Sequence, residues 1–274
     1  MQKLKRMILR RLIRMLHESE MRPVKQAPGA AHGAPTEFAH ADWKNFIRHD
    51  AMLNFFAQRG LLCRNAYDVG AYQGKWSEWT RRRFPEARLY LFEAIEEQYA
   101  NLRRVCSSLG NAELITHGLS DKPEEREITL WPSLSGSSVL PVRGQRFDHL
   151  PRRLIQLESI DHLVEAGRLP IPEIVKLDVQ GHELAVLKGA TSLFGKTDVF
   201  IAECSLHRYF GQVQPLAYEI WDFMRENGYE LFDICGTYRR PVDHALDQFD
   251  MVYLRRDSPL HKAGPLTGRH EFDW

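Results

Sequence analysis

The 274-residue sequence predicts an α/β domain built on a doubly wound parallel sheet. From residue 66 onward, short apolar segments typical of strands alternate with amphipathic segments typical of helices, and this order implies βαβ units with right-handed crossovers. An acidic residue follows at or near the end of five of these strand-like segments. Because open α/β sheets bind ligands outside the carboxyl ends of their strands, the same pattern predicts where a site lies.

The first 36 residues are expected to form a segment outside the globular domain at 37–258. Within residues 1–17, apolar side chains recur at helical spacing and Lys and Arg fill the opposite side. Such a basic amphipathic helix either lies on an anionic membrane surface, docks on a partner or packs on its own domain. The Ala-, Gly- and Pro-rich stretch at 26–36 is typical of a linker.

Charge and cysteine usage exclude several classes of function. Residues 1–26 carry eight basic and two acidic side chains, a net of +6, whereas the whole chain carries +1, so the body is mildly acidic at −5 and no nucleic-acid partner is expected. The four cysteines are scattered without zinc-finger spacing, and no metal is predicted. No apolar run approaches the ~20 residues that span a bilayer, so a cytoplasmic protein, in membrane contact at most through residues 1–17, is expected.

The predicted domain opens with a helix that Asp42 caps and Gly60 ends, and its last helix begins at Pro215 and ends at Gly228. The expected helices are 42–58, 75–84, 96–109, 182–193 and 215–227. The expected strands are 66–69, 88–92, 113–116, 173–178, 198–203, 231–234 and 251–254.

Residues 122–160 interrupt the alternation and are predicted to be an insertion. Short strands near Ile128 and at 154–159 flank a Ser/Gly-rich loop at 133–138. An insertion at this point lies near the ligand-binding edge of the sheet, where it is expected to supply a lid or substrate loop. Residues 259–274 are expected to be a C-terminal tail.

The turn after the first strand carries Gly70 and Gly74 and predicts close approach of a ligand to the backbone. It lacks the middle glycine of the dinucleotide fingerprint, so a cofactor without a pyrophosphate fits better. Glu93 lies 19 residues after Gly74, the usual distance for an acid that binds ribose hydroxyls. S-adenosylmethionine is such a cofactor. The alternatives are an NAD-dependent oxidoreductase and a non-catalytic scaffold that docks through its N-terminal helix.

Four motifs of the chain stand out: Asp68-Val-Gly-Ala-Tyr-Gln-Gly-Lys-Trp-Ser77, Phe92-Glu-Ala94, Gly118-Leu-Ser-Asp121 and, most specifically, the segment 174–190 with the sequence IVKLDVQGHELAVLKGA. Together they resemble the FkbM family of class I S-adenosylmethionine-dependent methyltransferases. Tyr72 departs from the Asn that the family usually carries there. The resemblance covers about residues 60–256 and implies a Rossmann-like, seven-stranded methyltransferase sheet with its last strand antiparallel.

The resemblance also implies O-methylation of sugar or polyketide-type hydroxyls, with a small-molecule or glycan acceptor. It places the methionine end of the cofactor at the glycine turn, the ribose at Glu93 and the reacting centre near Asp178. The cofactor-binding residues that it implies are Asp68, Gly70, Ala71, Tyr72, Gly74, Ser77, Glu93, Ala94, Ser120, Asp121 and Asp178.

An alcohol acceptor has to lose its proton to a general base, which typically contributes ~10²–10⁴-fold to the rate. His207 is the preferred base because an unperturbed histidine titrates near neutral pH, and Asp178 and Glu203 are the other catalytic residues predicted. Glu183 is instead expected to be an acid stabilised at a helix N-terminus. Asp178, Glu203 and His207 do not have the spacing of a metal signature.

Overall fold

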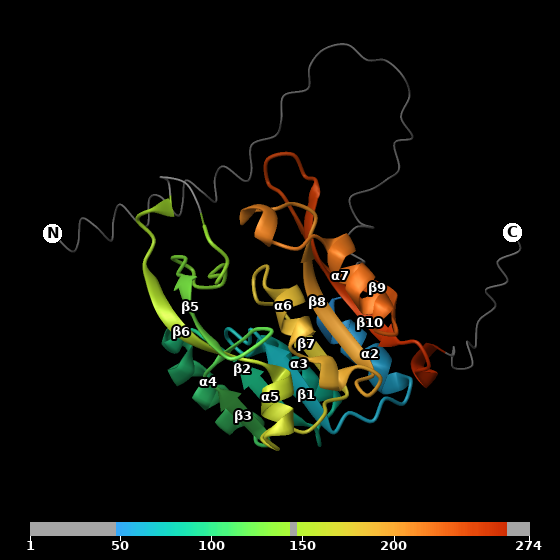
Figure 1. Ribbon diagram of the computed structural model, residues 1–274. Helices are drawn as coiled ribbons and strands as arrows, with labels where there is room; N and C mark the ends of the chain where they lie inside the picture. Colours follow the sequence, from blue (N-terminus) through green and yellow to red (C-terminus); the bar gives the residue numbers. More distant parts are fainter. Residues whose placement is uncertain (1–47, 143–146, 262–274) are drawn as a thin grey trace, which may run out of the picture. The chain divides into compact units, whose positions relative to one another are not determined.

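The computed structural model describes residues 48–142 and 147–261 (Figure 1). The helices of more than one turn are α2 (His49–Gln58), α3 (Lys75–Arg83), α4 (Glu96–Leu109), α5 (Ile160–Glu165), α6 (Glu183–Lys188) and α7 (Ala217–Glu226). The strands are β1 (Asn65–Val69), β2 (Arg88–Phe92), β3 (Ala112–Ile115), β4 (Gly118–Leu119), β5 (Glu124–Thr129), β6 (Arg152–Glu158), β7 (Ile174–Leu177), β8 (Val199–Ser205), β9 (Tyr229–Arg239) and β10 (Leu246–Arg255). Two compact units are distinguished, and both sheets belong to the one that comprises Phe46–Arg239 and Leu246–Trp274.

Seven strands form one sheet in the order β3-β2-β1-β7-β8-β10-β9. Neighbouring strands from β3 to β8 are parallel, whereas β10 runs antiparallel to both β8 and β9. The order reverses direction between β1 and β7, which is the switch point where open α/β sheets bind ligands. The predicted doubly wound sheet with an antiparallel last strand is therefore confirmed.

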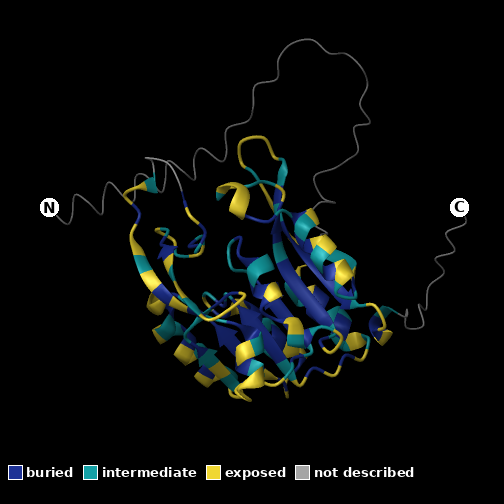
Figure 2. Cartoon of the chain, viewed as in Figure 1, coloured by how far each residue is buried: buried dark blue, intermediate teal, exposed yellow. Residues whose placement is uncertain are grey.

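Alternating strand residues enter two separate cores, because successive side chains of a strand point to opposite faces. Tyr67 and Val69 of β1 pack in the core that α5, α6 and α7 cover, whereas Ala66 packs in the core under α2, α3 and α4. The central strands β1, β2, β7 and β8 are accordingly buried along most of their length, and the helices that cover them carry many exposed positions (Figure 2).

Two strands of the insertion, β5 and β6, form a second sheet with β4, which lies just before the insertion, in the order β4-β6-β5. β6 pairs parallel with β4 and antiparallel with β5. This sheet has a small core of its own, in which Ile128 and Leu130 pack with Ile155, Leu157 and Ile95. The predicted short strands exist, but their assembly with β4 into one sheet was not predicted.

Several elements differ from the prediction. The helix expected at 182–193 ends at Lys188, where a Cβ on Gly189 would lie 2.3 Å from the backbone oxygen of Ser120. The last two strands are longer than expected. Helix α5 was not predicted, and the Ser159 side chain caps it by accepting a hydrogen bond from the His162 backbone N–H.

Some predictions concern residues outside the described ranges. These are the basic helix at 1–17, the linker at 26–36 and the tail beyond His261. The helix expected to begin at Asp42 instead begins at His49, with Arg48 as its N-cap in an extended conformation. In the part of the chain that the structure describes, no helix has both the length and the apolar composition to cross a membrane.

Candidate functional site

A cavity of about 340 Å³ opens at the carboxyl ends of β1, β2 and β7. The insertion forms its other side, through β5, β6 and the loop at 134–139. Five of the predicted cofactor-binding residues line this cavity: Gly70, Tyr72, Glu93, Ala94 and Asp178. The other predicted site residues are not among those that line it: Asp68, Ala71, Gly74, Ser77, Ser120, Asp121, Glu203 and His207.

Asp68 and Ser77 fix the turn between β1 and α3. The Asp68 carboxylate is buried and accepts hydrogen bonds from the Ser77 hydroxyl at 2.7 Å and the Ser77 backbone N–H at 3.2 Å. Gly74 is the N-cap of α3 and has φ of 77°, a left-handed conformation that favours glycine. These residues therefore shape the turn from behind the cavity wall.

Gly70 brings the ends of β1 and β7 into contact. Its φ is 74°, and a Cβ at this position would lie 1.8 Å from the backbone oxygen of Asp178, so only glycine is accommodated. Tyr72 is also left-handed, with φ of 49°, in a region where Asn is enriched among non-glycine residues. This conformation suits the Asn that the sequence resemblance implies at this position.

Glu93 presents a buried carboxylate to the cavity, with 6% of the residue exposed. Its two oxygens accept backbone hydrogen bonds at 2.8 Å, one from Tyr72 and one from Ile95. Burial raises the pKa of Glu93, and the Ile95 and Tyr72 donors oppose that rise. A carboxylate has about four acceptor sites on its two oxygens, so acceptor capacity remains for ligand hydroxyls beside these backbone donors.

Lys176 holds the acids of β1 and β7 together beneath the cavity. Its ammonium lies 3.2 Å from Asp178 Oδ2 and 3.6 Å from Asp68 Oδ1, and it donates a hydrogen bond to the Gly70 carbonyl. Burial opposes its charge, but the nearby carboxylates outweigh burial and raise the pKa of Lys176. The Asp178 side chain remains 34% exposed, and it lines the cavity.

Gln180 links Asp178 to a second, more deeply buried acid. Its side-chain amide donates to Asp178 Oδ1 and to Glu203 Oε2, both at 2.9 Å. Burial raises the pKa of Glu203 well above its usual range, and the charges of Asp178 and Glu183 add to that rise. Burial and the neighbouring carboxylates therefore disfavour the ionised form of Glu203.

Glu183 occupies the first position of α6 and is completely enclosed. Its carboxylate accepts hydrogen bonds from the backbone N–H groups of Val179 and Gly181. Burial raises its pKa against these donors. These contacts match the expected role of an acid that stabilises a helix N-terminus.

His182 lines the cavity and was not predicted as a site residue. Its Nε2 lies 3.0 Å from the Ser120 hydroxyl, which also donates to Asp121. Burial and the Arg126 charge lower the pKa of His182 to about 4, so its imidazole is neutral at physiological pH. Its place between Gly181 and Glu183 in the most specific motif was the available signal.

His207 lies beyond the end of β8 and is half-buried. His207 does not line the cavity, whereas Asp178 does. Of the three predicted catalytic residues, the structure thus brings one to the cavity wall.

Comparison with known proteins identifies the family. Residues 68–231 match the family described as the methyltransferase FkbM domain. The chain is 49% identical over 49 residues to the hexuronic acid methyltransferase AglP of Haloferax volcanii, covering 18% of this chain and 20% of that protein. It is 23% identical over 228 residues to the methyltransferase sdnD of Sordaria araneosa, covering 69% of this chain and 80% of that one.

Among solved structures, the chain is similar to the magnesium protoporphyrin IX methyltransferase ChlM of Synechocystis PCC 6803 with bound SAH. The two share 13% identity and a TM-score of 0.44, over 76% of this chain and 81% of that chain. The alignment with the archaeal hexuronic acid enzyme spans only a fifth of that protein's length.

The cavity residues fit S-adenosylmethionine, the methyl donor of this family. Glu93 offers two acceptor oxygens to a diol, and the missing Cβ of Gly70 leaves the turn close to the end of β7. The family match extends over more than half of the chain, from Asp68 to the start of the last strand pair. The chain belongs to the FkbM family of S-adenosylmethionine-dependent methyltransferases.

Proposed function

We propose that this methyltransferase transfers the methyl group of S-adenosylmethionine to a hydroxyl of a saccharide or glycan. The observation that carries the proposal is the carboxylate of Asp178, which lines the cavity at the end of β7. Family membership and the short segment shared with a hexuronic acid methyltransferase support it. The oxidoreductase and scaffold alternatives find no comparable support.

Each proposed role follows from the contacts of the residue. Glu93 would accept hydrogen bonds from the ribose hydroxyls, and His117, Gly118 and Leu119, which line the cavity, would border the adenine. Tyr72 anchors the turn, because its backbone donates to Glu93 and its hydroxyl donates to the Ser133 carbonyl. Asp68, Gly74, Ser77, Ser120 and Asp121 support these groups from outside the lining.

Asp178 is the proposed general base. When bound, S-adenosylmethionine would supply an electrophilic methyl group on its sulfonium sulfur, and this sulfur would become a neutral thioether once the acceptor oxygen takes the methyl group. Asp178 accepts the proton that the acceptor hydroxyl gives up, and Lys176 and Gln180 keep its carboxylate in place. Positioning of this kind supplies much of the rate enhancement in a displacement reaction.

The insertion supplies neutral polar groups suited to a hydroxylated acceptor. Ser135 and Ser137 line the cavity, as does Gln248 from β10. Neutral His182 adds a further hydrogen-bonding group without a charge. Ser137 and His182 are buried, and buried hydrogen-bonding sites select for ligands that carry the matching hydroxyls.

Methyl transfer to oxygen can be tested with donor labelled with ¹³C in its methyl group. The full-length chain is incubated with labelled S-adenosylmethionine and a panel of oligosaccharides with and without hexuronic acid. We expect a labelled methyl ether, detected by NMR and located by fragmentation mass spectrometry. A labelled methyl on nitrogen or carbon in place of oxygen would contradict the proposal.

A further inference from the structure

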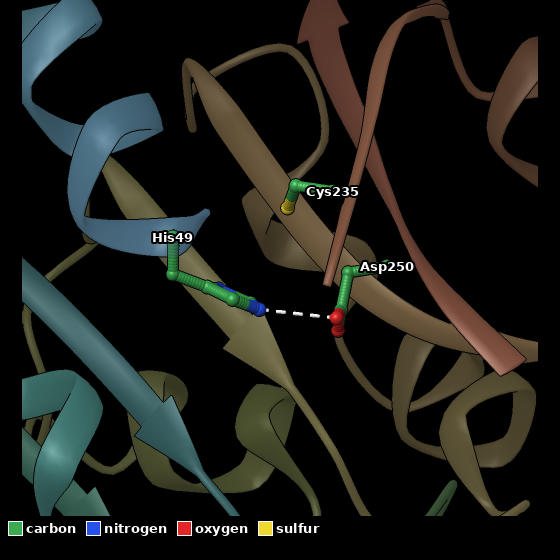
Figure 3. A group of neighbouring side chains, drawn as sticks. All are labelled: His49, Cys235 and Asp250. Atoms are coloured by element: carbon green, nitrogen blue, oxygen red, sulfur yellow. Dashed lines mark hydrogen bonds and ion pairs between the residues drawn. The ribbon is translucent and has the colours of Figure 1, made fainter. Parts of the chain in front are cut away.

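Three side chains of different chemistry converge under α2, away from the cofactor cavity. They are His49 at the start of α2, Cys235 on β9 and Asp250 on β10 (Figure 3). One ligand atom from each lies within 4.8 Å of the other two, and His49 Nε2 is 3.0 Å from Asp250 Oδ2. None of the three lines the cofactor cavity.

The strands place two of these side chains side by side. Asp250 and Cys235 are directly opposite in the antiparallel β9–β10 pair, so their side chains share one face of the sheet. In Figure 3 the Cys235 sulfur faces the space where the His49 ring approaches the Asp250 carboxylate. The pairing of β9 and β10 shifts register between Gln248 and Asp250, a local irregularity that re-aims side chains.

Gly236 leaves the room that this arrangement needs. Its φ is 58°, and a Cβ there would lie 2.0 Å from Asp250 Oδ2 and 2.9 Å from His49 Nε2. The Trp79 ring stacks on His49 with 6.3 Å between centroids. Within the described residues, the buried Nδ1 of His49 has no hydrogen-bond partner, so this imidazole is held by packing and by Asp250.

Negative charge dominates the surroundings of the three residues. Asp250 interacts electrostatically with Glu203 and Lys176, and Lys176 is already paired with Asp68 and Asp178. Burial raises the pKa of the Cys235 thiol, and the Asp250 charge raises it further. A bound divalent cation would balance the carboxylates and stabilise the thiolate.

We propose that His49, Cys235 and Asp250 bind one Zn²⁺. Imidazole nitrogen, thiolate sulfur and carboxylate oxygen are the donors that zinc prefers, and its bonds of about 2.0–2.3 Å at tetrahedral angles place ligand atoms roughly 3–4 Å apart. The widest distance between the three ligand atoms therefore has to shorten by about 1 Å or less when zinc binds.

The site is partly open to solvent, which allows an ion to enter and a water molecule to act as the fourth ligand. The His49 and Asp250 side chains are 15% and 11% exposed, so water can reach the metal and complete its coordination. On binding, the Cys235 thiol releases its proton to solvent and its sulfur bonds to zinc. The metal would tie the first turn of α2 to the β9–β10 pair.

Cobalt provides the test because a Co²⁺–thiolate bond gives a charge-transfer absorption band. The full-length chain is stripped with a chelator, titrated with Co²⁺ and then with Zn²⁺. We expect about one Co²⁺ per chain, a thiolate band and displacement of that band by zinc. Cys235→Ser should remove the band, and His49→Gln should weaken zinc binding by roughly 100-fold or more.

Cys106→Ser is the matched control, because Cys106 is a buried cysteine on α4 and should leave the band unchanged. Absence of the thiolate band in the wild-type chain would overturn the proposal, as would a band that survives Cys235→Ser. Should Cys235→Ser fail to fold, the wild-type titration and the folded His49→Gln variant still decide the outcome.

Discussion

Asp178→Asn is expected to lower kcat by roughly 10²–10⁴-fold, the usual contribution of a general base. The substitution keeps the size of the side chain but removes its ability to accept a proton from the acceptor hydroxyl. S-adenosylhomocysteine binding should persist, because Glu93 and the glycine turn are unchanged. Steady-state methyl transfer and a binding titration on the same preparation measure the two effects separately.

His207→Gln is the matched comparison, because His207 lies outside the cavity lining. It should retain most of the wild-type rate. The reverse result, with loss of activity in His207→Gln and a near-normal rate in Asp178→Asn, would assign the base to the histidine that the sequence pattern favoured.

Lys176→Met is expected to lower the free energy of unfolding by about 3–5 kcal/mol, the typical cost of removing one partner from a buried ion pair. The buried Asp68 carboxylate loses its cation, and Asp178 loses the contact at 3.2 Å that orients it. Urea denaturation followed by circular dichroism measures the change.

Lys188→Met provides the control for Lys176→Met, because Lys188 is exposed at the end of α6. Exposed positions of this kind usually change stability by no more than about 0.5 kcal/mol. Equal stability of the two variants would show that the buried ammonium does not hold the strand ends together.

The large sheet was predictable because its signals are local. Strand-like runs such as 88–92 are bounded by polar or turn residues on both sides, and several of them, such as 88–92 and 113–116, follow a helix with clear periodicity. The small sheet was not, since β4 has only two residues and its partner β6 follows 39 positions later in the insertion. Short strands carry too little pattern to reveal their partners.

The candidate site was predictable to a similar degree. Glu93 and Asp178 were expected from their place at strand ends, and both line the cavity. Sequence position cannot say which way a strand-end side chain points, so Asp68 was grouped with the cavity residues although its carboxylate holds Ser77. The zinc ligands join positions 49, 235 and 250, a separation that no local motif encodes.

The most direct test of the cofactor assignment is calorimetric titration of S-adenosylhomocysteine into the full-length chain. We predict one-to-one binding to the wild type, weakened by roughly 100-fold or more in Glu93→Ala because two hydrogen bonds to a charged carboxylate are lost. Glu86→Ala, at an exposed position just before β2, should bind like the wild type. No binding by the wild type, or equal binding by Glu93→Ala, would contradict the account.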